Sequence, residues 1–234
     1  MQKKARKKRI DIIDALRGCA IIYMVYHHLV YDLVVFADAP SRLVDNAVID
    51  ILQPIFASVF IVLCGVSSNF SKSNLKRGAI TLAVAMVITL VTTIMDMPIV
   101  FGVLHLLSVC MLLYGCTRKL FEKINGILLL VICIALAVIS RYCVNNIDVQ
   151  SGNLWILGWQ GDFVSYDYFP LFPWVFVFLS GTAVGRYIAG GSFPEWFYNA
   201  KIPVLPAIGR HSLIIYIAHQ PVLYALTLII SLFK

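Results

Sequence analysis

The chain has 234 residues, of which 60% are hydrophobic and 13% charged, and its mean hydropathy is +0.86. Soluble domains carry about 25% charged residues, so this composition excludes an ordinary soluble domain and indicates an integral membrane protein. The net charge of +7 comes from basic residues spread along the chain between apolar runs. A nucleic-acid-binding surface, which needs a concentrated basic patch, is therefore excluded.

Seven apolar runs are long enough to cross the roughly 30 Å hydrocarbon core of a bilayer. They lie at roughly residues 15–36, 48–69, 78–97, 99–117, 124–141, 168–189 and 211–232. The predicted fold class is therefore all-α, a polytopic transmembrane helical bundle of about seven spans. Because no soluble segment, low-complexity tract or repeat interrupts it, we expect residues 1–234 to form a single domain, with residues 1–10 as a basic tail.

The distribution of positive charge predicts the orientation, since Lys and Arg near span ends are retained in the cytoplasm. With the N-terminus inside, sixteen of the 19 basic residues fall on the cytoplasmic side, and only Arg42, Arg141 and Lys234 fall outside. We therefore expect a cytoplasmic N-terminus. The first apolar run is too long for a cleaved signal peptide and contains His and Asp, so it is interpreted as a retained helix.

The first apolar run carries a stripe of polar residues. Arg17 and His28 are eleven positions apart, which on a helix puts them about 20° apart around the axis and roughly 16 Å apart along it. Asp14, Tyr31 and Asp32 lie within about 60° of the same direction. Ionisable groups in a membrane span normally face the interior of a bundle, so this stripe is the main functional hypothesis.

Two histidines in different runs are expected at a similar depth. His28 and His105 both lie roughly 9–12 Å below the predicted outer surface, so they can share one cavity. Asp32 follows His28 by four residues and can accept a proton from one imidazole nitrogen, which leaves the other as a base. His27 points about 100° away and is interpreted as structural.

Two further features each have two interpretations, and a third has a structural one. His219, on a face with Ser212, Tyr216 and Gln220, fits a hydrogen-bonding seam and a substrate-binding site equally well. The outer segment at about 142–167 holds Trp155, Trp159 and Asp162, which suit either a sugar site or an interfacial aromatic belt. Gly181 and Gly185 are four residues apart and predict close helix packing.

Several classes of chemistry have no motif in the chain. The six cysteines lack the paired spacing of a disulfide or zinc framework, so we expect no metal. A phosphate-cradling glycine loop and a Gly-x-Ser-x-Gly nucleophile are also missing. The sequence therefore gives no support for ATP-driven or zinc-dependent chemistry.

At the level of motifs, the chain resembles the bacterial proteins grouped with the heparan-alpha-glucosaminide N-acetyltransferase catalytic domain, within the transmembrane acyltransferases. The motifs that carry the resemblance are Leu16-Arg17-Gly18 with His28, the run 59–68 followed by 75–78, Phe101–His105, Phe172-Pro173-Trp174 with Gly181 and Gly185, and 209–212 with His219-Gln220-Pro221. The spacing of Arg17 and His28 is also similar to that of membrane enzymes that O-acetylate surface glycans. The lysosomal enzyme departs from this chain in having an asparagine at the position of His28.

This resemblance implies transfer of an acetyl group from cytoplasmic acetyl-CoA, as co-substrate without a permanently bound cofactor, to a sugar amine or hydroxyl on the outer face. The family also implies a multi-pass protein of the bacterial cytoplasmic membrane. The residues expected to hold the CoA phosphates are Arg17, Lys72, Lys76, Arg77 and Arg210. The predicted catalytic residues are His28, Asp32 and His105.

In the expected reaction, His28, oriented by Asp32, either deprotonates the acceptor or takes the acetyl group itself. His105 and Tyr31 would polarise the thioester carbonyl. The predicted substrate-binding residues are Tyr31, Trp155, Trp159, Asp162 and His219.

Two other functions remain open at this point. A proton-coupled transporter or exporter also places His and Asp in its spans, although the chain lacks a detectable inverted repeat. A noncatalytic membrane subunit of another enzyme is the third hypothesis. The sequence leaves open the acceptor, N- or O-acylation, and whether the protein assembles as a homo-oligomer in the lipid bilayer.

Overall fold

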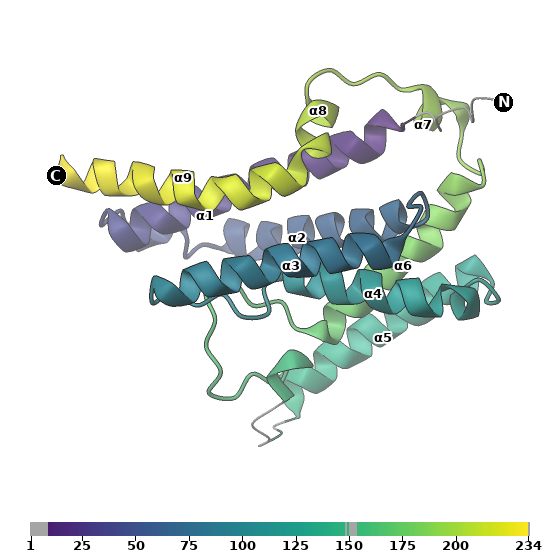
Figure 1. Cartoon of the computed structure of the whole chain (residues 1–234), viewed down its shortest axis with the longest axis horizontal. Helices are drawn as coiled ribbons and strands as arrows, with labels where there is room; N and C mark the ends of the chain where they lie inside the picture. The colour runs from purple at the N-terminus through teal and green to yellow at the C-terminus, as the bar shows by residue number, and fades with distance from the viewer. Residues whose placement is uncertain (1–8, 148, 150–153, 234) are drawn as a thin grey trace. The chain divides into compact units, whose positions relative to one another are not determined.

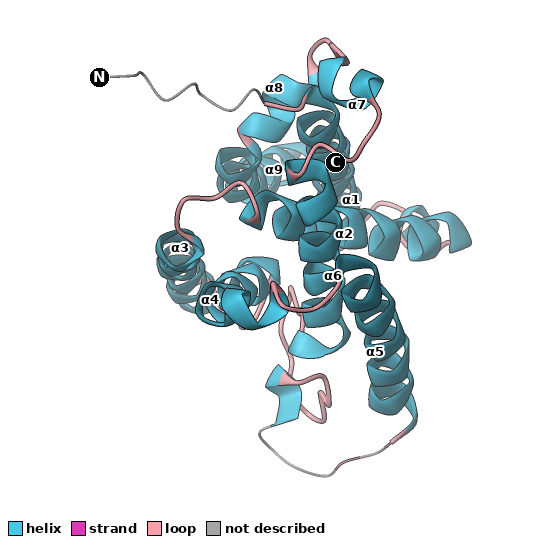
Figure 2. Ribbon diagram, turned by 90° about the vertical axis from the view of Figure 1, so that its right-hand side faces the viewer, coloured by secondary structure: helices cyan, strands magenta, loops and turns pink. Residues whose placement is uncertain are grey.

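The computed structural model describes residues 9–147, 149 and 154–233. Most of the basic tail predicted at residues 1–10 therefore lies outside the described residues. Figure 2 shows helices joined by loops, with no strand in the described part of the chain. The all-α prediction is confirmed.

Seven of the described helices are long and apolar enough to cross a membrane. They are α1 (Asp11–Phe36), α2 (Ala47–Ser68), α3 (Asn74–Ile94), α4 (Val103–Phe121), α5 (Gly126–Asn146), α6 (Leu171–Ala189) and α9 (Ser212–Leu232). Four short elements lie between them, namely η1 (Ser41–Leu43), η2 (Leu154–Ile156), α7 (Glu195–Asn199) and α8 (Leu205–Arg210). The seven predicted spans are confirmed, and the protein is a multi-pass membrane protein. The side of the membrane that holds the N-terminus stays a prediction.

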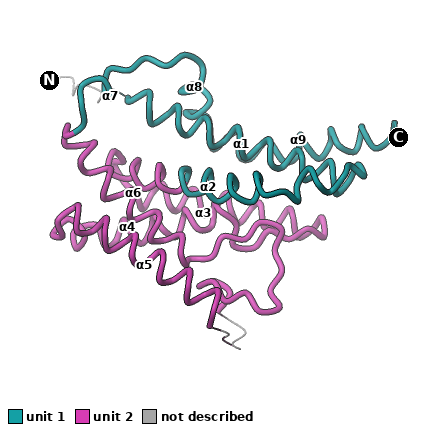
Figure 3. Tube along the Cα trace, turned by 180° about the vertical axis from the view of Figure 1, so that it is seen from behind, with its two compact units in different colours: residues 1–60, 193–234 teal, residues 61–192 magenta. Residues whose placement is uncertain are grey.

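The chain divides into two compact units, coloured separately in Figure 3. The first unit comprises residues 1–60 and 193–234, and the second comprises residues 61–192. The boundary falls inside α2, after Phe60. The expectation of a single functional domain stays a prediction.

In the first unit, α1 packs against α8 and α9, as Figure 1 shows. Two glycines make the crossing of α1 and α8 possible. A side chain on Gly18 would collide with the carbonyl oxygen of Leu205, and one on Gly209 would collide with the carbonyl oxygen of Asp14. Residues far apart in sequence, 16–18 and 209–212, are therefore brought together by direct contact of their backbones.

In the second unit, glycines also set the closest helix contacts. A Cβ atom on Gly65 of α2 would collide with the carbonyl oxygen of Phe178, and one on Gly181 of α6 would collide with that of Val62. Gly185, one turn further along α6, packs in the same way against Val66. The close packing predicted for Gly181 and Gly185 is confirmed, because small residues let helix backbones approach in a membrane.

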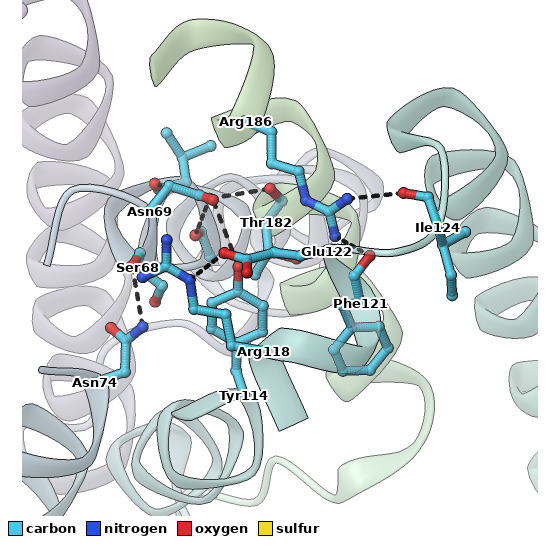
Figure 4. A network of polar contacts seen from close by, with 12 residues as sticks. Ser68, Asn69, Asn74, Tyr114, Arg118, Phe121, Glu122, Ile124, Thr182 and Arg186 are labelled. Carbon is cyan, nitrogen blue, oxygen red and sulfur yellow. Dashed lines mark hydrogen bonds and ion pairs between the residues drawn. The ribbon is translucent and has the colours of Figure 1, made fainter. Parts of the chain in front are cut away.

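A polar network connects α2, α4 and α6 in the second unit (Figure 4). The Asn69 amide donates to the carbonyl oxygen of Thr182 over 3.0 Å, and its oxygen accepts from the Tyr114 hydroxyl over 3.4 Å. The Arg186 guanidinium donates to the carbonyl oxygens of Phe121 at 2.7 Å and Ile124 at 3.0 Å. Phe121 is the last residue of α4 and Ile124 lies in the turn that follows it, so Arg186 ties the end of α4 and this turn to α6.

We predict that Gly181→Ala destabilises the protein, because its methyl group would have to displace the α2 backbone at Val62. The cost of such overpacking is about 1–3 kcal/mol, which lowers the midpoint of thermal unfolding in detergent. Ala135→Val, which adds carbon atoms at an exposed position of α5, is the matched control. Equal midpoints for the two variants would contradict the prediction.

Candidate functional site

Four polar side chains of α1 and α9 come together inside the first unit. We refer to His28, Asp32, His219 and Gln220 as the α1–α9 polar cluster. The rings of His28 and His219 are edge to face, with centroids 4.9 Å apart. The Gln220 amide donates to both oxygens of Asp32, over 3.1 Å and 3.0 Å. Consecutive residues of α9 therefore meet residues one turn apart on α1.

The hydrogen bonds of the two histidines define which ring nitrogen carries the proton. Nδ1 of His28 lies 2.9 Å from the carbonyl oxygen of Met24, and Nδ1 of His219 lies 2.6 Å from that of Tyr216. A carbonyl oxygen can only accept, so each Nδ1 must donate. In each neutral ring, Nε2 then holds a free lone pair.

The observed hydrogen-bond partner of Asp32 differs from the one predicted from the sequence. We expected its carboxylate to orient His28, but the His28 ring is oriented by the Met24 carbonyl and the carboxylate accepts from Gln220. The reason is geometric: on one helix a histidine reaches the carbonyl four residues earlier. Asp32 meanwhile faces α9, where it is 1% exposed.

The α1–α9 polar cluster is rich in acceptors and poor in donors. Its acceptors are the two Asp32 oxygens, Gln220 Oε1 and the Nε2 atoms of both histidines, whereas the Gln220 amide is its donor. The Nε2 of His219 and the Oε1 of Gln220 are buried without a hydrogen-bond partner. Buried polar atoms normally have partners, so these atoms point to a ligand that brings hydrogen-bond donors.

Two of the expected phosphate-binding residues, Arg17 and Arg210, belong to the first unit and lie where α1 and α8 cross. Arg17 donates to Asp14 over 2.8 Å and is adjacent in sequence to Gly18. Arg210, adjacent to Gly209, is exposed. The glycine contacts that join these segments therefore bring two of the expected phosphate-binding residues to one end of the unit.

The other three expected phosphate ligands belong to the second unit. Lys72 and Lys76 are exposed, and the Arg77 guanidinium lies 3.4 Å from the carbonyl oxygen of Ser67. The hydroxyl of Ser73 accepts from the Lys76 backbone over 3.1 Å and so caps α3. The start of α3 thus presents basic side chains from a capped helix end.

His105 is buried in the second unit with the opposite tautomer. Its Nε2 lies 3.1 Å from the Thr89 hydroxyl oxygen, and that hydroxyl lies 2.6 Å from the carbonyl oxygen of Ile99. The Thr89 proton must go to the carbonyl, so His105 Nε2 carries a proton and donates to Thr89. His28 and His105 lie in different units, and their expected meeting in one cavity stays a prediction.

The outer segment packs on the start of α4 within the second unit. An Asp167 carboxylate oxygen accepts from the Val103 backbone over 3.2 Å, which caps α4. The Trp155 ring stacks on Phe163 with centroids 4.2 Å apart. The Tyr168 hydroxyl donates to the carbonyl of Trp155, and burial raises the pKa of Tyr168. Trp155 is thus held on one ring face by protein contacts.

The remaining predicted substrate ligands differ in their surroundings. The Trp159 indole donates to the carbonyl oxygen of Ile147 over 2.8 Å, and Asp162 is exposed. Tyr31, on α1, is 39% exposed. Their substrate-binding roles stay predictions. Among the described residues, no three His, Cys, Asp or Glu side chains converge to hold a metal ion.

Sequence reasoning placed Gln220 on the His219 face, as part of a hydrogen-bonding seam or a substrate site, but did not name Asp32 as its partner. The signal that could have found it was a pair of polar residues, His219 and Gln220, in one apolar run and another pair, His28 and Asp32, in a second. Polar groups in membrane spans tend to bond one another. Neither apolar run, however, indicates that these two helices pack against each other.

The chain matches a known protein family. Residues 9–221 match the family described as heparan-alpha-glucosaminide N-acetyltransferase, catalytic. The chain belongs to this family. The resemblance inferred from the motifs is thereby confirmed, and the family supports acyltransferase activity in general. Neither the search of curated proteins nor that of solved structures gives a match.

The match covers the whole α1–α9 polar cluster in this member of the N-acetyltransferase family. It begins before α1 and ends at Pro221, directly after Gln220. The last turns of α9 lie beyond it. The matched region therefore contains both histidines, the Asp32–Gln220 pair and the crossing of α1 and α8.

We predict that Asp32 and Gln220 stabilise the protein as a coupled pair. Gln220→Ala leaves a buried carboxylate without its donor, whereas the same change in an Asp32→Ala background leaves nothing unsatisfied. A double-mutant cycle of unfolding free energies in detergent should give a coupling of about 0.5–3 kcal/mol. Additive effects of the two substitutions would contradict the pairing.

Proposed function

We propose that the protein transfers an acetyl group from cytoplasmic acetyl-CoA to an amine or hydroxyl of a glycan or related small acceptor on the outer face. The observation that carries this proposal is the acceptor-rich α1–α9 polar cluster in a member of an acyltransferase family. A site that offers lone pairs is suited to a ligand that brings N–H or O–H groups. Sugar amines and hydroxyls have this chemistry.

In the proposed reaction, His28 acts as the general base. The acceptor nitrogen or oxygen attacks the thioester carbon while its proton moves to His28 Nε2. The tetrahedral intermediate then expels the CoA thiolate, which takes that proton and leaves as a thiol. The imidazolium that forms in between is stabilised by the negative charge of Asp32, one turn along α1.

The acetyl-CoA phosphates are proposed to lie at the crossing of α1 and α8. Arg17 and Arg210 supply positive charge there, and charge-assisted hydrogen bonds to phosphate are strong. Lys72, Lys76 and Arg77 of the second unit are proposed as further phosphate ligands. Arg17 lies on the same helix as His28, eleven residues away, so one helix would carry donor-binding and proton-accepting groups.

Tyr31 of the first unit and four residues of the second unit are proposed to assist with the carbonyl and the acceptor. Tyr31 of α1 would donate to the thioester oxygen as negative charge develops on it, and His105 would do so by exchanging its hydrogen bond to Thr89 for one to that oxygen. Trp155, Trp159 and Asp162 would contact the sugar. The cytoplasmic N-terminus and the location in a bacterial cytoplasmic membrane belong to the same proposal.

We predict that His28→Ala lowers the transfer of labelled acetyl groups from acetyl-CoA in isolated membranes by about a hundredfold or more, since a general base contributes that much. Arg17→Ala should raise the KM for acetyl-CoA by about tenfold through the loss of charge-assisted hydrogen bonds. CoA release, followed with a thiol reagent, gives a second readout. His27→Ala, on another face of α1, and Arg42→Ala, in η1, are the matched controls.

Undiminished transfer in both the His28 and Arg17 variants would contradict the proposed function. Movement of a solute across vesicles without any requirement for acetyl-CoA would instead support a transporter. Comparable losses in the control variants would show that the effect is not specific to these residues. Amounts of folded protein in each membrane preparation provide the normalisation.

A further inference from the structure

A chain of hydrogen bonds in the second unit ends on the buried ring of His105. The helices α3 and α4 lie side by side (Figure 1), and Thr89 of α3 reaches both this ring and the connection between the two helices. The Thr89 hydroxyl donates to the carbonyl oxygen of Ile99 over 2.6 Å, and its oxygen lies 3.1 Å from His105 Nε2. The hydroxyl has one proton, so towards His105 it can only accept.

The outer segment holds the other side of this chain in place. The peptide group that carries the Ile99 carbonyl also carries the Val100 N–H, which donates to the Ser165 hydroxyl over 3.0 Å. Ser165 in turn donates to the carbonyl oxygen of Asp167 over 2.8 Å. A carbonyl oxygen only accepts, so every hydrogen bond from Asp167 back to His105 has one possible direction. The Thr89 hydroxyl therefore has a fixed orientation.

The other histidines with a ring hydrogen bond follow the opposite rule. His28, His211 and His219 each place Nδ1 within 2.9 Å of a carbonyl oxygen three or four residues earlier in the chain. Such a carbonyl lies within reach of any histidine inside a helix, and it draws the ring proton to Nδ1. A helical histidine in this protein thus carries its proton on Nδ1 unless another group opposes that choice.

At His105 the local backbone does not supply this acceptor. The residue four positions earlier is Phe101, which precedes the first residue of α4 and has a left-handed backbone with φ of 61°. Its carbonyl oxygen accepts from the Phe169 backbone over 3.0 Å. The carbonyl that would hold Nδ1 thus serves another donor, and Thr89 holds Nε2 instead.

We propose that Thr89 is a positioning residue for acetyl transfer, which keeps the proton of the neutral His105 ring on Nε2 until the thioester oxygen replaces Thr89 as its acceptor. The inference rests on the proposed function and deepens it by adding a residue that acts through His105. Without the hydroxyl, a buried Nε2–H would have lost its acceptor, which is costly. The proton would then move to Nδ1, and the ring would no longer donate from Nε2.

The first test observes the ring proton directly. In ¹⁵N NMR spectra of histidine-labelled protein in detergent, a ring nitrogen that carries a proton is distinguished from one that does not, and His105→Gln identifies the His105 signals. We compare wild type, Thr89→Val, Thr89→Ser and Thr117→Val. The valine side chain has the shape of threonine without the hydroxyl, whereas serine keeps the hydroxyl. Thr117, whose hydroxyl donates to the Leu113 carbonyl of its own helix over 2.6 Å, is the matched control.

We expect the proton on Nε2 in wild type, Thr89→Ser and Thr117→Val, and on Nδ1 in most molecules of Thr89→Val. The second test measures acetyl transfer by purified protein from labelled acetyl-CoA to glucose or glucosamine as probe acceptors. The kcat of Thr89→Val should fall about tenfold, the effect of losing one hydrogen bond. Its KM for acetyl-CoA should stay unchanged, because the lost donor acts in the transition state. Thr89→Ser should restore the wild-type kcat.

Three results would overturn the proposal. They are an Nε2-protonated His105 in Thr89→Val, a changed tautomer with an unchanged kcat, and equal losses of kcat in Thr89→Val and Thr89→Ser. If Thr89→Val does not fold, Thr89→Ala removes the same hydroxyl and gives the same comparison. Failure of both to fold beside a folded Thr89→Ser would assign the hydroxyl to stability and overturn its role in transfer.

Failure of the proposed function is distinguishable from failure of this inference. Absence of acetyl transfer by wild type to either probe would count against the proposed function, while the NMR comparison would still decide whether Thr89 sets the tautomer of His105. Active wild type with an unchanged tautomer in Thr89→Val would leave the acetyltransferase function standing and refute the role of Thr89.

Discussion

The hydrogen bonds between Asp32 and Gln220 are the interaction on which the first unit depends. Both residues lie in apolar helices long enough to cross a membrane, and hydrocarbon offers no hydrogen bonds to a carboxylate. The carboxylate must therefore find its donor within the protein, and it finds it on α9. Because both Asp32 oxygens accept from one amide, the pair defines the register of α9 along α1. His219, the neighbour of Gln220, is then held opposite His28.

Close approach of backbones is the second condition for this arrangement. Hydrophobic burial does not drive helices together in a bilayer, so their association depends on packing and polar contacts. Gly18 and Gly209 have no side chains that would separate α1 from α8, and each lies next to an arginine. The same device operates in the second unit at Gly65, Gly181 and Gly185. These glycines of the motifs are thus explained by steric contact.

The histidines illustrate how local hydrogen bonds prepare a side chain for proton transfer. A backbone carbonyl that holds Nδ1 fixes both the tautomer and the direction of the ring. This holds for His28 and His219, whose free nitrogens are then acceptors, and is reversed in His105, which donates to Thr89. A base needs a ring nitrogen with a free lone pair, as in His28 and His219. A group that polarises a carbonyl needs a ring nitrogen that carries a proton, as in His105.

Much of the fold could be predicted because its determinants are local or compositional. The length of each apolar run indicates a membrane span, and the helical period places Arg17, His28 and Asp32 on one stripe of α1 without reference to any other helix. The spacing of Gly181 and Gly185 indicates a close contact, although it does not name Val62 and Val66 as the residues contacted. The prediction of a partner for Asp32 was wrong for a similar reason. Spacing along one helix suggested His28, but the carboxylate faces a different helix.

The sequence by itself determined the membrane class, the seven spans, the family and the identity of the polar residues, because hydropathy and motif spacing are properties of neighbouring positions. Only the tertiary structure decided that α9 pairs with α1, that Gln220 binds Asp32, and that His219 rather than Asp32 stands against the His28 ring. The physical reason is that hydrogen bonds and ring contacts between residues about 190 positions apart depend on how helices pack. No period within a single helix encodes that choice of neighbour.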